Sequence, residues 1–179
     1  MKFFLSLLVG LLLLHPAAFA QSKNEEVLQW SATRKLTWAD YKASPDPDSD
    51  AAASTTTYLS IEYNISSSRF SYSIESRFSK DRSWGKHKSA YILSHEQGHF
   101  DIAEVFARKL HKKMSEYRFN SKTYQKELKK IYEEVTDEKE EIQNAYDRET
   151  KHSINKEKQA EWLKKIQEML DEYADYADY

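Results

Sequence analysis

The chain has 179 residues, no cysteine and a formal net charge of -2. This length suits one domain with one hydrophobic core, and the near balance of acidic and basic residues argues against nucleic acid or an anionic membrane surface as a partner. The lack of cysteine excludes disulfides and thiolate ligands, which leaves histidine, aspartate and glutamate as the residues that could bind a metal ion such as zinc.

The first 20 residues have the organisation of a secretory signal peptide. Lys2 gives a positive start, residues 3–14 form an apolar run, and Ala18-Phe19-Ala20 matches the small-x-small pattern of a cleavage site. The run is shorter than the roughly 20 residues that a membrane-spanning helix needs. We therefore predict cleavage after Ala20, one domain over residues 21–179, a secreted or periplasmic location, and no stable membrane insertion afterwards. An uncleaved anchor is the alternative.

The first part of the predicted domain has the pattern of strands and turns. Residues 36–41 form a short aromatic element with a strand-like pattern, and residues 44–50, with two prolines, form a loop. Residues 55–65 and 69–78 alternate β-branched or aromatic residues with polar ones, and the three serines at 66–68 suit a hairpin turn. We expect a small antiparallel sheet.

The rest of the chain has helical periodicity. The pattern predicts one helix over residues 87–117, a second over 121–149, and a third that begins after the capping residue Asn155. The acidic, tyrosine-rich end at 173–179 is expected to be a frayed, solvated tail. The predicted fold class is α+β, with a small N-terminal antiparallel sheet followed by three helices.

His95-Glu96-Gln97-Gly98-His99 lies in the first predicted helix and matches the H-E-x-x-H pattern. Side chains four residues apart on a helix lie about 40° apart and one turn apart, so both imidazoles can reach one ion at about 2.0–2.1 Å. Glu96 points about 100° round the helix, where its carboxylate can take a proton from a water molecule that zinc acidifies. We predict His95 and His99 as zinc ligands and Glu96 as the catalytic base.

Two ordinary core histidines are the alternative interpretation of this motif. Both histidines fall on the apolar face of the helix, where two polar rings side by side cost free energy unless both find partners. One metal ion satisfies both rings. Gly98 in the helix interior costs about 1 kcal/mol relative to alanine, which indicates close packing against that turn.

A zinc site needs a third protein ligand. His111 lies about 160° from His95 on the predicted helix and is expected to face solvent, and His87 lies two turns too early. His152, in the break between the second and third helices, can fold back onto the first helix, and we predict it as the third ligand. Carboxylates of the second helix stay open as alternatives: Glu141, Asp147 and Glu149.

Three stretches of the chain carry a family resemblance: Leu36–Tyr41, His95–Glu104 followed by Ala107-Arg108, and Tyr146-Asp147-x-x-Thr150-x-His152 followed by Gln159 and Trp162. They resemble a bacterial family of unknown function whose members are described as predicted secreted zinc-dependent proteases. The resemblance implies a zincin-like core around the H-E-x-x-H helix and supports His152 as the third ligand.

The same stretches contain further residues of interest. Asp101 is expected to point away from the metal and to pair with a basic residue, and Glu104 is expected on the side of the helix opposite His95. Tyr146 is a candidate donor to the oxyanion of the reaction, with a core tyrosine as the alternative. Trp38 and Trp162 are expected to be core aromatics.

These features together predict a secreted zinc-dependent peptidase that hydrolyses a peptide or protein substrate with Glu96 as general base. In a zincin-like protein an edge strand lines the cleft and can pair with an extended peptide, and residues 55–63 or 70–78 are expected to do this. The alternatives are a zinc hydrolase of another amide bond, for example in cell-wall peptides, and a non-catalytic binding module on a zincin scaffold.

Overall fold

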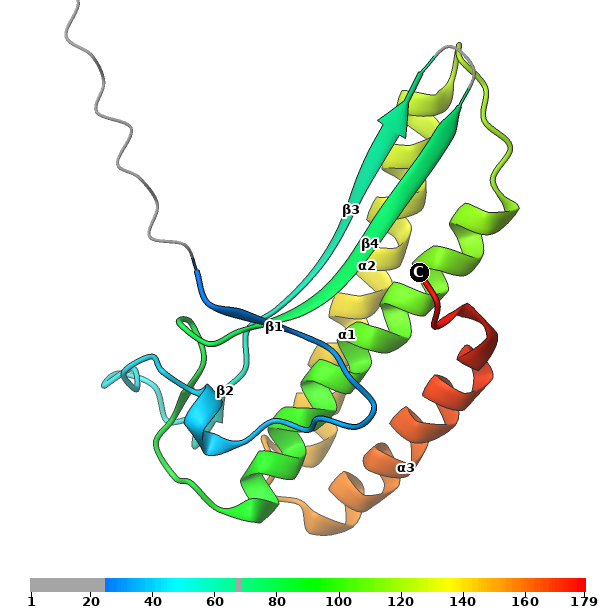
Figure 1. Cartoon of the computed structure of the whole chain (residues 1–179). Coiled ribbons are helices and arrows are strands. Elements are labelled where there is room, and N and C mark those ends of the chain that lie inside the picture. The colour runs from blue at the N-terminus through cyan, green and yellow to red at the C-terminus, as the bar shows by residue number, and fades with distance from the viewer. Residues whose placement is uncertain (1–24, 67–68) are drawn as a thin grey trace, which may run out of the picture.

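The computed structural model describes residues 25–66 and 69–179. Within them, strands β1 (Val27–Gln29), β4 (Phe70–Ser79) and β3 (Thr57–Ile65) form an antiparallel sheet in the order β1-β4-β3, and β2 (Ala53–Ser54) pairs with β5 (Trp84–Gly85). The same part of the chain forms the helices α1 (Ala90–Glu116), α2 (Tyr124–Thr150) and α3 (Lys156–Glu172). The predicted α+β class, with the sheet before the helices, is confirmed (Figure 1).

Strands β3 and β4 form a long hairpin that runs alongside α1 (Figure 1). Leu59 and Ile74 point from these strands into the core, as the alternation of apolar and polar residues predicts. The strand ends differ from the predicted ranges by at most two residues. Of the predicted turn, Ser67 and Ser68 lie outside the described residues, as do the predicted signal peptide and its cleavage site.

The aromatic element at residues 36–41 is not a strand. It contains a 3₁₀ turn, η1 (Trp38–Asp40). The Asp40 carboxylate accepts hydrogen bonds from the backbone N–H of Thr37 at 2.8 Å and from its hydroxyl at 2.9 Å. This local side-chain capping favours the turn over an extended strand.

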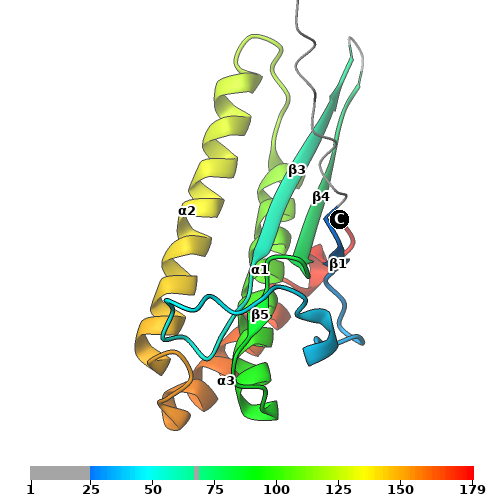
Figure 2. The ribbon, with the colours of Figure 1, turned by 90° about the vertical axis from the view of Figure 1, so that its left-hand side faces the viewer.

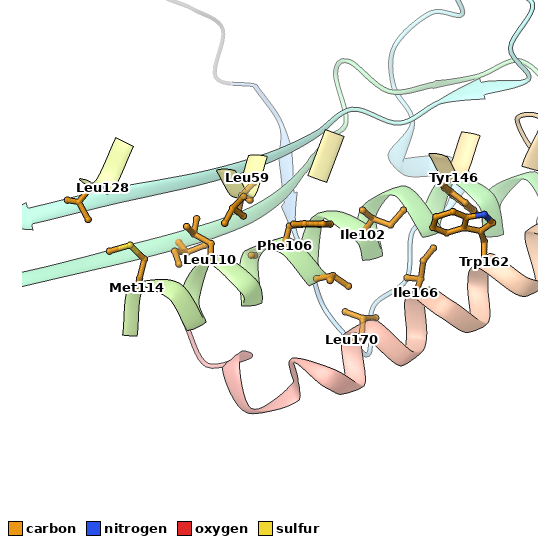
Figure 3. Close-up of a cluster of buried hydrophobic side chains, with 14 residues drawn as sticks. Leu59, Ile102, Phe106, Leu110, Met114, Leu128, Tyr146, Trp162, Ile166 and Leu170 are labelled. Atoms are coloured by element: carbon orange, nitrogen blue, oxygen red, sulfur yellow. The ribbon is translucent and has the colours of Figure 1, made fainter. Parts of the chain in front are cut away.

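Helix α1 is the centre of the molecule, because it contacts the sheet on one side and both other helices on the others. Figure 3 shows the core on these faces, with Ile102, Phe106 and Leu110 of α1 among the side chains of the sheet and of α2 and α3. Trp162 lies in this core as expected. No helix of the described residues is long and apolar enough to span a membrane.

The end of the chain is not the frayed tail that its composition suggests. Residues 173–179 include a second 3₁₀ turn, η2 (Ala174–Tyr176), that packs on α1. The Tyr179 hydroxyl donates a hydrogen bond to the carboxylate of Glu104, which is buried on α1 and pairs with Arg108 at 2.9 Å. The tail packs on α1 because Tyr179 provides a hydrogen-bond donor for the buried Glu104 carboxylate.

The tail also changes the environment of His111. This side chain was expected to face solvent, but its ring contacts the rings of Tyr72, Tyr176 and Tyr179 edge-on. His111 does point away from the predicted metal face, as its position on the helix predicts. It does not face solvent, because strand β4 and the tail cover that side of α1.

Candidate metal centre

The two histidines of the motif lie on successive turns of α1. The helix starts at a capping residue, Ser89, whose hydroxyl accepts a hydrogen bond from the backbone N–H of Ile92 at 3.1 Å. From this start, His95 and His99 both face α2, and their Nε2 atoms lie 3.2 Å apart. The ring of Tyr146 on α2 stacks on His95 with 4.5 Å between ring centres.

Asp147 completes the group from α2. Its Oδ1 atom lies 3.1 Å from the Nε2 atom of His95 and 3.1 Å from that of His99. Three ligand atoms around a tetrahedral ion at about 2.0–2.1 Å lie about 3.3–3.4 Å from one another, so this triangle fits one zinc-sized ion. Of the described residues, His95, His99 and Asp147 form a group that can hold a metal ion.

The negative charge of Asp147 suits a metal ligand, and the two histidines stabilise it. Burial alone would raise the pKa of Asp147, but hydrogen bonds from His95 and His99 and their charges hold it well below its usual range. Burial alone would lower the pKa of His99, but the hydrogen bond and charge of Asp147 hold it above its ordinary value. The carboxylate is therefore ionised, which is the form that binds a cation.

Gln143, one turn before Asp147 on α2, orients His99. Its amide donates to the backbone carbonyl of His99 at 2.9 Å, and its Oε1 atom accepts a hydrogen bond from His99 Nδ1. With Nδ1 as the donor, a neutral His99 ring has its lone pair on Nε2, so a metal ion would take the place of the proton that Nε2 shares with Asp147.

Glu96 is held by residues from the N-terminal part of the chain. Its Oε2 atom accepts a hydrogen bond from the Thr55 hydroxyl at 2.6 Å, and the Thr55 oxygen lies 2.8 Å from the Tyr41 hydroxyl. Since Thr55 has one hydroxyl hydrogen, Tyr41 is the donor to Thr55. Burial, aided by the charge of Glu96, raises the pKa of Tyr41, so this hydroxyl stays protonated. Sequence reasoning missed both residues, although Tyr41 lies in the first family-like stretch.

His152 lies near the group but outside it. Its Nδ1 atom is 3.4 Å from Asp147 Oδ1, and its side chain is 69% exposed. Lys151, His152 and Ser153 all have positive φ angles, of 51°, 50° and 72°, so the chain turns through the left-handed region at this point. The turn brings His152 beside Asp147, and the role of His152 as a zinc ligand stays a prediction.

Tyr146 lies in the core below the motif. It is fully buried, and its hydroxyl donates to the backbone carbonyl of His95 at 3.2 Å. A Cβ atom on Gly98 would lie 2.5 Å from the Tyr146 hydroxyl oxygen, which explains the glycine inside the helix. This position matches the core-tyrosine interpretation, because the hydroxyl does not line the cleft described below.

The other family-like residues lie away from the group. As expected, Asp101 pairs with a basic residue, Lys35, at 3.4 Å, and it also accepts a hydrogen bond from Trp30 Nε1 at 2.7 Å. Glu104 is bound to Arg108 and Tyr179. Of the alternative ligands on α2, Glu149 instead accepts a hydrogen bond from Trp162 Nε1 at 2.9 Å.

An open cleft of about 580 Å³ lies over the group. Helices α1 and α2 supply the histidines, Glu96 and Asp147, and the loop before β3 lines the opposite side; Figure 2 shows this loop reaching across toward α2. The segment that lines this side of the cleft, called the lining segment below, is 51–57 and contains β2. The strands expected to line the cleft, 55–63 and 70–78, overlap with this segment only at 55–57. The cleft is also lined by Asp46, Ser49, Trp84, Lys139, Glu140, Gln143, His152 and Ser153.

Comparison with known proteins identifies a family but no characterised relative. A family model described as a bacterial protein of unknown function (DUF922) matches residues 18–153, which include both histidines, Glu96, Asp147 and His152. No curated protein and no solved structure matches the chain.

Proposed function

The chain belongs to the DUF922 family of bacterial proteins of unknown function, and we propose that it is a zinc-dependent peptidase that acts outside the cytoplasm. The observation that carries the proposal is the triangle of His95, His99 and Asp147 beside the Glu96 carboxylate in an open cleft. Catalytic zinc sites use three nitrogen or oxygen ligands from the protein and keep one position open. Zinc held there would act as a Lewis acid and would lower the pKa of a nearby water molecule.

Glu96 supplies the acid–base chemistry in this proposal. The hydrogen bond from Thr55 fixes its Oε2 atom, which leaves the Oε1 atom to accept a proton from the attacking water. The protonated carboxyl then gives this proton to the leaving amine. Because Glu96 is only 4% exposed, bulk water competes little for the carboxylate.

The lining segment favours an extended peptide as substrate. The Ala52 carbonyl accepts hydrogen bonds from the backbone N–H of Lys86 at 2.8 Å and of His87 at 2.9 Å, so Ala52 faces β5. In antiparallel pairing, alternate residues turn their backbone groups to opposite sides. Ala53 therefore directs its N–H and C=O groups away from β5, where an extended peptide can pair with them.

The test of this function is Glu96→Gln in the zinc-loaded protein, assayed on casein and on cell-wall peptides. We expect hydrolysis of the peptide substrate to fall by about 10²–10⁴-fold, because a general acid–base group contributes that much, while zinc content stays the same. Glu157→Gln, an exposed carboxylate on α3, is the control and should keep full activity. Full activity in Glu96→Gln would refute the assigned base.

A further inference from the structure

One face of α2 forms a wall of the cleft. Lys139, Gln143 and Asp147 are spaced four residues apart, so they share this face, and all three line the cleft. Asp147 belongs to the metal group, which is the triangle of His95, His99 and Asp147, and Gln143 forms a hydrogen bond with His99. Lys139 lies two turns before Asp147, at about 12 Å from it along the helix axis, and has no role in the metal group.

The ammonium group of Lys139 is half-buried without a partner. In the described part of the chain, its Nζ atom makes no hydrogen bond and no ion pair, whereas Lys109 and Lys113 of α1 pair with Glu138 and Glu134 of α2. Burial lowers the pKa of Lys139. A half-buried charge without a partner costs free energy, which a bound anion would recover.

Lys139 is also the one lysine or arginine among the described residues that line the cleft. The carboxylates along the same lining are Asp46, Glu96, Glu140 and Asp147, of which the metal centre uses two. Away from the zinc site and Glu96, the carboxylates of Asp46 and Glu140 repel a negatively charged substrate group, and Lys139 attracts it.

We infer that Lys139 binds a carboxylate of the substrate and so determines which peptides are cleaved; this inference rests on the proposed peptidase function. An extended chain advances about 3.3–3.4 Å per residue, so 12 Å corresponds to about three or four residues. The carboxylate then lies within about four residues of the cleaved bond. It belongs either to an acidic side chain or to the C-terminus of the peptide, which offer the same chemistry.

A binding experiment separates these sources without relying on turnover. Zinc-loaded Glu96→Gln protein is titrated with fluorescent, C-terminally amidated peptides that carry a single Glu, Gln or Lys at each position in turn. A Gln peptide with a free C-terminus is the second arm. At one position, or with the free C-terminus, we expect binding at least about tenfold tighter than for the neutral amidated peptide, because a hydrogen bond to a charged group is worth that much.

Variants of Lys139 test its part in this preference. Lys139→Gln should abolish the preference, and Lys139→Glu should reverse it in favour of the Lys peptide. Lys130→Glu is the matched control, since Lys130 is 74% exposed on α2 and its replacement changes the net charge equally. In active protein, Lys139→Gln should raise KM for the preferred peptide about tenfold and leave kcat unchanged, as loss of uniform binding predicts.

The outcomes distinguish this inference from the proposed function. Cleavage of peptides with no charge preference, or an equal effect of Lys130→Glu and Lys139→Glu, would overturn the role of Lys139 and leave the peptidase in place. If the protein neither binds nor cleaves any of the peptides, both proposals fail.

Discussion

At the scale of single residues, the position of the Glu96 carboxylate depends on a hydroxyl that is far away in the sequence. Thr55 donates to Glu96, and Tyr41 donates to Thr55. A carboxylate without this hydrogen bond would rotate about its last bond. The Glu96 carboxylate instead has its Oε2 atom bound to Thr55, and its Oε1 atom is available for a proton. Thr55 is therefore expected to be a positioning residue for the base.

Thr55→Val keeps the shape of the side chain and removes the hydrogen bond to Glu96. We expect kcat to fall about tenfold or more, because a hydrogen bond to a charged group contributes about 1.5–3 kcal/mol, while zinc content stays the same. Thr55→Ser keeps the hydroxyl and should restore most of the rate. Equal kcat values for Thr55→Val and the wild type would show that Glu96 does not depend on this bond.

The sequence predicts those site residues that lie together on one helix, and not the residues that packing brings to it. The spacing of His95, Glu96 and His99 is a property of α1 alone, so it could be read directly. Asp147 was one of several carboxylates left open on the second helix, because the rotation of α2 against α1 depends on packing. Thr55 carries no local signal, since its contact to Glu96 spans 41 residues.

At the scale of elements, the metal group depends on how closely α1 and α2 approach each other. Gly98 and Tyr146 set this distance, because the tyrosine ring lies where a side chain at position 98 would be. Both ends of α1 and α2 were predicted within about three residues, and so was the start of α3, since periodicity and the cap at Asn155 are local. The 3₁₀ turn at 38–40 was missed because Asp40 capping outweighs the strand-like pattern.

Gly98→Ala distinguishes helix propensity from packing. Propensity alone predicts stabilisation by about 1 kcal/mol. The Cβ atom would lie 2.5 Å from the Tyr146 hydroxyl oxygen, so we expect destabilisation by about 1–3 kcal/mol, together with weaker zinc binding as α2 moves away. Urea unfolding measures the first effect and metal titration the second. A more stable variant with unchanged zinc affinity would contradict the packing account.

At the scale of the whole molecule, the C-terminal tail closes the structure around α1. Composition suggested a solvated tail, but it does not show that Glu104 is buried and needs a donor. Tyr179 supplies this donor from 75 residues away in the sequence. The tail thereby joins residue 179 to the helix that carries His95 and His99.

Tyr179→Phe removes the hydroxyl and leaves the ring. We expect a loss of about 1–3 kcal/mol in the free energy of unfolding, because the buried Glu104 carboxylate loses a donor. Tyr176→Phe is the matched control, since Tyr176 lies in the same tail and no hydrogen bond of its hydroxyl occurs in the described part of the chain. Urea unfolding of both variants should separate them, and equal stabilities would contradict a tail anchored by Glu104.

The zinc content of the purified protein, measured after dialysis, tests the central claim most directly. We predict one zinc per chain in the wild type and loss of zinc in His95→Ala, because we propose that the triangle of His95, His99 and Asp147 holds the ion. Asp147→Ala beside His152→Ala identifies the third ligand, and the geometry predicts the larger loss for Asp147→Ala. A wild type that retains no zinc, or a His95→Ala variant that retains all of it, would contradict the metal centre.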